Sequence, residues 1–316
     1  MVPAKFIEGA SDKLAERWVA TLLTPAFCFW AGGFFIITQL DIWASIRDSL
    51  NNLSEPYQIA VLVICLLVIA ASAFIVQRFD LVVLRFLEGY WSQHLKLLRS
   101  LRQRNLQHYE KKLRFIKDQL QDLMRLKTDQ QTDQQSNPEI FEKQARVDYQ
   151  RRWLPSQPQY LMPTELGNIL RAAELRPEAK YGLNAVVCWP HLWMLLPDHP
   201  RSDLQEARAS LNTAARVWLW GLLFLIWAIF GIWTPWALLA LPMGFITMVL
   251  TYRWSLSAAR SYGDLLDAAF DLYRDELYKA LRWPLPENSE TERTMGKQLS
   301  EFLWRGPVHH ISYLDP

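Results

Sequence analysis

Three long stretches without a charged side chain most strongly constrain the fold of this 316-residue chain. They cover residues 18–40, 56–77 and 217–252 and are 23, 22 and 36 residues long. All 34 Lys and Arg and all 32 Asp and Glu lie outside them. A helix rises about 1.5 Å per residue and the hydrocarbon core of a bilayer is about 30 Å thick, so about 20 apolar residues span it. The chain is therefore predicted to be a membrane protein, although its mean hydropathy of −0.04 is that of a soluble one.

The third stretch is too long for one crossing, because a single helix of this length would reach about 54 Å. Its middle, residues 231–236, reads Gly-Ile-Trp-Thr-Pro-Trp, and Pro235 does not continue a helix from the residue before it. We therefore predict two short spans of about 17 residues joined by a tight turn. The fold class expected is all-α, with four transmembrane helices in two hairpins, 18–77 and 216–253, plus a helical cytoplasmic domain.

The distribution of Lys and Arg predicts the orientation. Residues 41–55 contain one basic and three acidic side chains, whereas residues 78–127 contain 12 Lys and Arg against 5 Asp and Glu. Basic loops stay on the cytoplasmic side. We expect the N-terminus (1–17), the central region and the C-terminal segment (254–316) to be cytoplasmic.

Two cytoplasmic segments are expected to be long helices of opposite charge. Residues 78–127 contain no Pro, and their apolar residues recur at intervals of three and four, with a register skip between Leu101 and Leu106. Residues 255–283 also lack Pro and carry an acidic line on one face. We expect these two helices to pack together, and long helices of this kind to support a homo-oligomer. A flexible linker (128–137) and a helical domain (138–215) lie between them in sequence.

The acidic line consists of Asp264, Asp267, Asp271 and Asp275, at helical spacings. The sequence leaves three interpretations open: a solvated or salt-bridged helix face, a vestibule of carboxylates that concentrates cations in an oligomer, or a metal-binding group.

An uncharged segment, Tyr181–Pro197, interrupts the cytoplasmic region. Pro190 and its length argue against a fifth span, so it is interfacial, re-entrant or part of the cytoplasmic core. Basic and aromatic side chains around it form a possible patch for an anionic small molecule or a protein partner. They are Arg171, Arg176, Lys180, Trp189, His191 and Trp193.

No span contains Asp, Glu, Lys, Arg or His, which disfavours charge-coupled transport but leaves a passive pore open. Candidate pore-lining or helix-packing residues in the spans are Thr21, Thr24, Gly32, Gly33, Thr38, Gln39, Pro242 and Thr247.

Motifs for catalysis are missing from the sequence. It has no Gly-rich phosphate loop, no Gly-x-Ser-x-Gly and no His-Glu-x-x-His, and its three Cys are dispersed. We expect no enzyme activity, no cofactor and no metal site. Nucleic-acid binding is also not expected, because Trp91 and Tyr109 belong to the apolar stripe and not to the basic face.

Three segments resemble a set of uncharacterised bacterial membrane proteins over roughly residues 160–305. They are 166–174 (LGNILRAAE), 181–193 (YGLNAVVCWPHLW), and 268–272 (AAFDL) with 281–284 (LRWP). The resemblance implies a bacterial inner-membrane protein and implies no activity.

Two functions remain open. The first is a homo-oligomeric, ligand- or stress-gated pore with a cytosolic sensor domain. The alternative is a non-conducting scaffold or receptor whose cytosolic domain recruits a partner.

Overall fold

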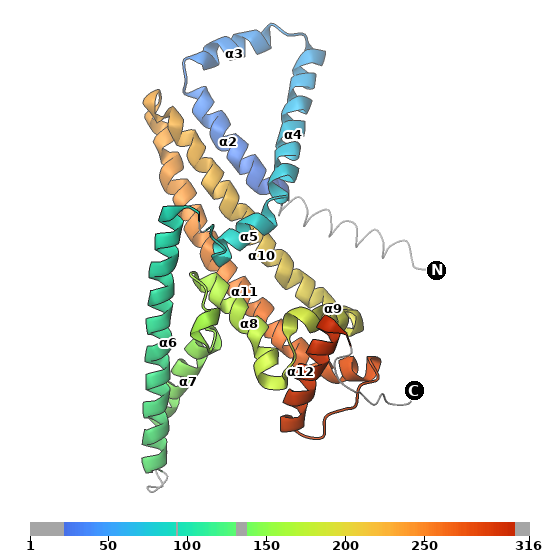
Figure 1. Cartoon of the computed structure of the whole chain (residues 1–316). Helices are drawn as coiled ribbons and strands as arrows, with labels where there is room; N and C mark the ends of the chain where they lie inside the picture. Colours follow the sequence, from blue (N-terminus) through green and yellow to red (C-terminus); the bar gives the residue numbers. More distant parts are fainter. Residues whose placement is uncertain (1–21, 93, 131–137, 307–316) are drawn as a thin grey trace, which may run out of the picture. The chain divides into compact units, whose positions relative to one another are not determined.

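The computed structural model describes residues 22–92, 94–130 and 138–306, and within them the fold is all-α, as predicted, with 11 α-helices (Figure 1). The chain divides into two compact units. The apolar unit contains described residues 22–84 and 210–255, and the polar unit contains 85–209 and 256–306. The predicted cytoplasmic N-terminus (1–17), Thr21, most of the predicted linker and residues 307–316 lie outside the described residues.

The first hairpin of the apolar unit is α2 (Thr24–Thr38) and α4 (Glu55–Gln77), joined by the short helix α3 (Ile42–Asn51) (Figure 1). The predicted first span thus ends at Thr38, and the chain bends by 104° into α3. Only 11% of the most apolar 18-residue stretch of α4 is buried, so most of its apolar side chains are exposed. An apolar helix surface of this kind is suited to contact with lipid.

The second hairpin begins in α10 (Asp198–Phe224) and continues through the 3-10 helix η3 (Leu225–Ile232). The 3-10 helix η4 (Pro235–Leu239) then leads into α11 (Ala240–Ala280). The break between η3 and η4 falls where Pro235 predicted it. By length and composition, three described helices are able to cross a membrane, and four if the bent pair α2–α3 counts as one span.

Helices of the apolar unit approach each other closely at small residues. A Cβ added at Gly33 would lie 2.0 Å from the Trp227 ring, and one at Gly32 would lie 2.6 Å from the Phe224 ring. Trp30 Nε1 donates to Ser72 Oγ at 3.1 Å, which ties α2 to α4.

A buried ion pair joins α10 to the start of α5 (Asp80–Glu88) within the apolar unit. Arg216 Nε donates to Asp80 Oδ1 at 3.1 Å, and a second guanidinium nitrogen contacts Oδ2. The side chains are only 7% and 12% exposed, so each charge depends on the other for compensation.

The expectation of one continuous helix over 78–127 is wrong. α5 ends at Glu88, and the next helix, α6 (Lys96–Gln130), begins seven residues after Gly89. Gly89 adopts a φ of +97°, a conformation that side chains with a Cβ rarely take. A single Gly therefore ends the helix, and α6 instead extends three residues beyond its predicted end.

The second half of α6 packs on α7 (Pro138–Arg152), which runs beside it (Figure 1). Apolar residues three and four apart on α6 form their shared core, as the stripe predicted, whereas Leu97 and Leu101 near its start are exposed. The acidic line of α11 was expected to pair with the basic helix 78–127, and this prediction is wrong. The bases that pair with it come from α7 and from α8 (Glu165–Tyr181).

The main core of the polar unit surrounds the C-terminal half of α11. α8, α9 (Ala185–Leu195) and α12 (Ser289–Arg305) pack there against fully buried Phe270 and Tyr278. Within the uncharged segment, Cys188 and Leu192 on α9 are fully buried and Met194 is 80% exposed. One face of this segment is therefore part of the core.

Candidate ligand-binding cleft

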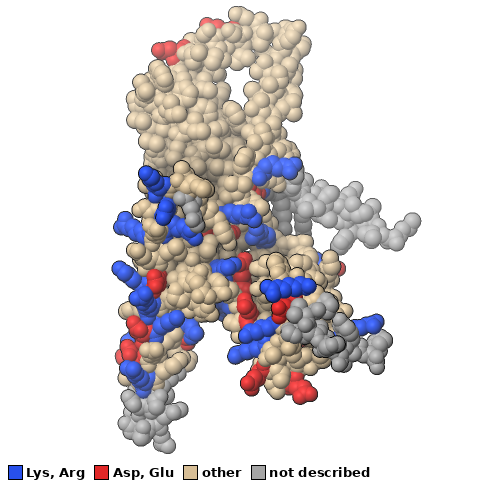
Figure 2. Space-filling model, in the orientation of Figure 1, with Lys and Arg blue, Asp and Glu red and all other residues tan. Residues whose placement is uncertain are grey.

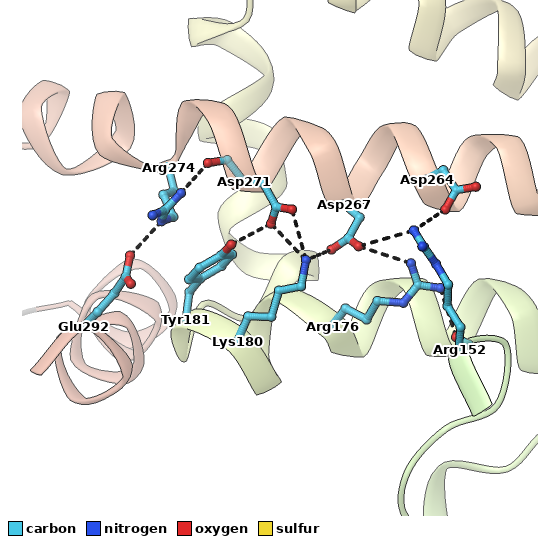
Figure 3. Close-up of polar contacts among 9 residues, drawn as sticks. All are labelled: Arg152, Arg176, Lys180, Tyr181, Asp264, Asp267, Asp271, Arg274 and Glu292. Carbon is cyan, nitrogen blue, oxygen red and sulfur yellow. Dashed lines mark hydrogen bonds and ion pairs between the residues drawn. The ribbon is translucent and has the colours of Figure 1, made fainter. Parts of the chain in front are cut away.

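The acidic line of α11 contacts basic side chains of α7 and α8 (Figure 3). Asp267 lies at its centre and is only 10% exposed. It accepts from Lys180 Nζ at 2.8 Å and from Arg176 at 3.4 Å, with Arg152 at 3.8 Å. Arg152 also donates to Asp264 at 2.5 Å. The carboxylates thus position three basic residues of neighbouring helices.

Asp271 extends this network toward α12. It accepts from Lys180 Nζ at 3.0 Å and from the Tyr181 hydroxyl at 2.6 Å. Burial, and then the hydrogen bond to Asp271, raise the pKa of Tyr181 to about 12, so the phenol keeps its proton and donates. Arg274 contacts the Asp271 carbonyl and donates to Glu292 at 2.7 Å.

Three of the four predicted vestibule acids, Asp264, Asp267 and Asp271, therefore lie in ion pairs within the unit. Asp275, the fourth, lies next to Arg274 on α11 and acts on it electrostatically. Carboxylates compensated in this way have less charge available to attract mobile cations.

Local contacts at the start of α8 determine where its bases lie. Thr164 caps the helix, accepting from Gly167 N at 3.1 Å. Asn168 is 1% exposed and donates to the carbonyls of Met162 and Thr164 at 2.8 and 2.9 Å, while its Oδ1 accepts from Met162 N at 2.8 Å. A buried amide satisfied by three backbone partners specifies one conformation of the turn. The Leu-Gly-Asn sequence at 166–168 thus has a structural role.

α12 approaches the end of α8 without intervening side chains. Gly182, at the C-terminus of α8, has a φ of +72°, and a Cβ there would lie 2.1 Å from the Arg293 carbonyl oxygen. A Cβ at Gly296 would lie 2.0 Å from the carbonyl of the last α8 residue. Ser300 Oγ accepts from Asn184 N at 2.9 Å. These contacts fix α12, and with it Arg293, beside α8.

Between α7, α8 and α12 lies a cleft of about 530 Å³, which we call the basic cleft. Its volume is typical of small-molecule sites. The connecting segment 154–160 contributes Leu154, Pro155 and Tyr160 to the wall. Five basic and two acidic side chains line it: Arg151, Arg152, Arg176, Arg293 and Lys297, with Asp148 and Glu178.

The five bases differ in how far they are already compensated. Arg152 and Arg176 pair with α11 carboxylates and lie over the Trp153 ring at 5.4 and 4.8 Å. Burial lowers the pKa of Arg176, and the Asp267 carboxylate opposes this. Arg293 uses Nε to donate to the Lys180 carbonyl at 3.2 Å. Arg151 and Lys297 make no ion pair among the described residues.

A second cavity of about 550 Å³ adjoins the basic cleft and shares Tyr160 and Lys297 with it. Arg171 lines this cavity, pairs with Glu174 at 3.3 Å and lies 5.6 Å from the centre of the Tyr160 ring.

The basic members of the sequence-predicted patch are thus divided. Arg176 lines the basic cleft, Arg171 lines the second cavity, and the Lys180 ammonium is used in pairs with α11.

The other members of the patch lie on α9. Trp189 and Trp193 contact each other at 5.6 Å between ring centres and pack on the core, Trp189 against Phe270. His191 is exposed. The two indoles therefore serve packing.

The hydroxyls predicted to line a pore bond to their own helices. Thr38 Oγ1 donates to the Phe35 carbonyl at 2.6 Å, and Thr247 Oγ1 to the Met243 carbonyl at 2.9 Å. Gln39 Nε2 donates to Thr38 Oγ1 at 3.4 Å.

The remaining candidates lie where helices begin or touch. Gly32 and Gly33 face aromatic rings, as described above. Thr24 is the first residue of α2, and Pro242 is the third residue of α11, directly after η4.

Arg151, Arg293 and Lys297 were not among the predicted site residues. Arg293 and Lys297 are four residues apart and so share one helix face, next to Gly296. That spacing was available in the sequence, but its partner Arg151 lies about 140 residues away.

Within the described residues, no group of three or more His, Cys, Asp or Glu could hold a metal ion. Comparison with known proteins finds no matching family model, no matching curated protein and no matching solved structure.

Proposed function

We propose that this chain is a receptor anchored in the bacterial inner membrane. In this proposal the apolar unit spans the bilayer, and the polar unit lies in the cytoplasm and binds a ligand through the basic cleft. The observation that carries the proposal is the basic cleft itself, a cavity of about 530 Å³ with more basic than acidic side chains in its wall. Clefts that combine apolar walls with a few converging polar groups are the usual sites of small ligands.

The competing hypothesis is a homo-oligomeric gated pore. The pore hypothesis assigns the hydroxyls and small residues of the spans to the lining of a water-filled path. In the apolar unit, Thr38 and Thr247 instead donate to carbonyls of their own helices, and Gly33 is covered by Trp227. These contacts support the non-conducting receptor.

The proposed orientation rests on charge. Figure 2 shows Lys and Arg side chains gathered over the polar unit, while the helices of the apolar unit are almost free of them on the face shown. Basic segments stay on the cytoplasmic side. Homo-oligomer formation remains a prediction that light scattering of the detergent-solubilised chain can check.

The test places a photo-cross-linking amino acid at Gln157, in the wall of the basic cleft, in living cells. Phe141 serves as the control, because it is 75% exposed on α7 and does not line the cleft. We expect an adduct from position 157 only, and no conductance from the purified chain in planar bilayers. Conductance under voltage or tension, or equal labelling from both positions, would contradict the receptor.

A further inference from the structure

We propose that the basic cleft binds the phosphate group of a phosphorylated small molecule or lipid headgroup, through Arg151, Arg293 and Lys297. This inference rests on the proposed receptor function and adds the chemical class of its ligand. It follows from which cleft bases remain available, how they are held and what else lines the cavity.

Availability separates these three bases from the other two. Arg152 and Arg176 are already paired with Asp264 and Asp267 on α11. Arg151 and Lys297 have no ion-pair partner among the described residues, and Arg293 bonds only a backbone carbonyl, through Nε. The terminal nitrogens of Arg293 and all the donors of the other two can therefore reach a ligand.

The three available bases come from two helices held in place by other contacts. Arg293 and Lys297 lie on α12, whose approach to α8 depends on Gly182 and Gly296. Arg151 is the penultimate residue of α7 and lies two residues before Trp153, whose ring the Arg152 and Arg176 guanidiniums flank. The helices therefore need no ordering when a ligand binds, and only the exposed side chains of the three bases lose conformational freedom.

Several bases around one cavity suit phosphate better than carboxylate. A carboxylate has two oxygens, which one guanidinium satisfies in a bidentate pair, whereas a phosphate monoester offers three acceptor oxygens and nearly two charges. Tyr160, Leu154 and Leu175 supply an apolar wall for the rest of the molecule. The volume of about 530 Å³ is enough for a ligand larger than phosphate alone.

Asp148 and Glu178 also line the cleft and oppose an anion. Removing an acidic and a basic side chain of the cleft should therefore change phosphate affinity in opposite directions. Removing Glu178, which is exposed and makes no side-chain ion pair among the described residues, should tighten phosphate binding, while removing Lys297 should weaken it.

The experiment measures binding of inorganic pyrophosphate to the full chain in phosphatidylcholine nanodiscs, by protection of α7 and α12 amides from hydrogen exchange. We expect Lys297→Gln and Arg151→Gln each to weaken binding about tenfold, the loss of one charge-assisted hydrogen bond. Glu178→Gln should strengthen binding a fewfold. Lys143→Gln, an equal change of charge at an exposed α7 position outside the cleft, should leave it unchanged.

Two further arms identify the anion and its source. Citrate, bound as tightly as pyrophosphate with the same dependence on Lys297, would overturn the phosphate inference and leave the receptor intact. Phosphatidic acid, a lipid phosphate monoester, is added to the nanodisc in the second arm. If it competes through Lys297, the inference is supported with a lipid headgroup as the source; if it does not compete, bound pyrophosphate supports a soluble source.

The inference is overturned if pyrophosphate gives no saturable protection of the cleft, or if Lys143→Gln weakens it as much as Lys297→Gln. Because the proposed receptor fails on a different result, namely conductance or the absence of a cleft-specific adduct, the two failures are distinguishable.

Discussion

The two units differ in how often their polar side chains connect one helix to another. In the apolar unit, hydroxyls bond to carbonyls three or four residues earlier in the same helix, as Thr38, Thr247 and Thr251 do. In the polar unit, Asp267 pairs with bases of neighbouring helices, and the Ser300 hydroxyl accepts from Asn184 N while it also donates to the Gly296 carbonyl of its own helix. Among the described residues, polar contacts between helices are thus few in the apolar unit, whereas in the polar unit they connect α7, α8, α11 and α12.

The ion pair Asp80–Arg216 and the Trp30–Ser72 hydrogen bond both link helices within the apolar unit, and breaking the buried ion pair should have the largest effect. Removing one partner of a buried pair typically costs about 3–5 kcal/mol, because the other charge loses its compensation. We expect Asp80→Ala to lower the free energy of unfolding by about this amount in detergent-based denaturation. Asp48→Ala is the control, since its side chain is 70% exposed, and it should cost less than about 0.5 kcal/mol. Equal effects would show that the pair is not a structural link.

Asp267 tests the same idea in the polar unit. Asp267→Asn weakens contacts to Arg152, Arg176 and Lys180 at once and should cost roughly 2–3 kcal/mol. Asp264→Asn, at a side chain 49% exposed and with one close partner, should cost less than about 1 kcal/mol. Denaturation monitored by exchange of α8 amides separates the two, and a larger effect at Asp264 would contradict the central place of Asp267.

Glu88 predicts a dependence on pH. Burial raises its pKa from 4.5 to about 7, with Arg208 opposing and Glu174 adding to the rise. A raised carboxyl pKa means that the folded state prefers the neutral form. The contribution of Glu88 to the free energy of unfolding is therefore most favourable below about pH 4.5 and falls as the pH rises to about 7.

Glu88→Gln should remove that dependence. We expect the variant to be more stable than the wild type by on the order of 2 kcal/mol at pH 8 and equal to it at pH 4. Unfolding curves at several pH values measure this. A constant difference across the range would mean that another group titrates.

Two hydroxyls give the smallest and most direct comparison. Ser300→Ala removes the acceptor for Asn184 N and should cost about 1 kcal/mol. Thr247→Val removes a bond within a single helix and should cost less than about 0.5 kcal/mol. If thermal unfolding shows the reverse order, the contrast between the units fails.

Parts of this fold could be predicted because they depend on local sequence. Pro235 predicted the break between two spans, since proline restricts its own residue and the one before. The apolar residues of 106–123 predicted the buried face of α6 from their spacing alone.

Other parts depend on contacts that a single sequence does not reveal. The break at Gly89 requires a positive φ, and Gly also occurs inside helices, as at Gly296. The sequence does not show whether the acidic line of α11 is a salt-bridged face or an open carboxylate surface. The ion pairs with α7 and α8 depend on contacts between helices that are distant in sequence. The basic cleft combines Arg151 and Lys297, which are far apart in sequence.

The alkylation rate of Cys188 can report how often the core of the polar unit opens. The Cys188 thiol is fully buried and lies 3.6 Å from Ser300 Oγ. Burial, opposed by that contact, raises its pKa to about 11, so at neutral pH it is protonated and unreactive. Alkylation at this position therefore requires α9 and α12 to separate. The alkylation rate measures how often this local opening occurs. α12 forms one wall of the basic cleft. A ligand bound there should therefore slow the alkylation of Cys188 without contacting its sulfur.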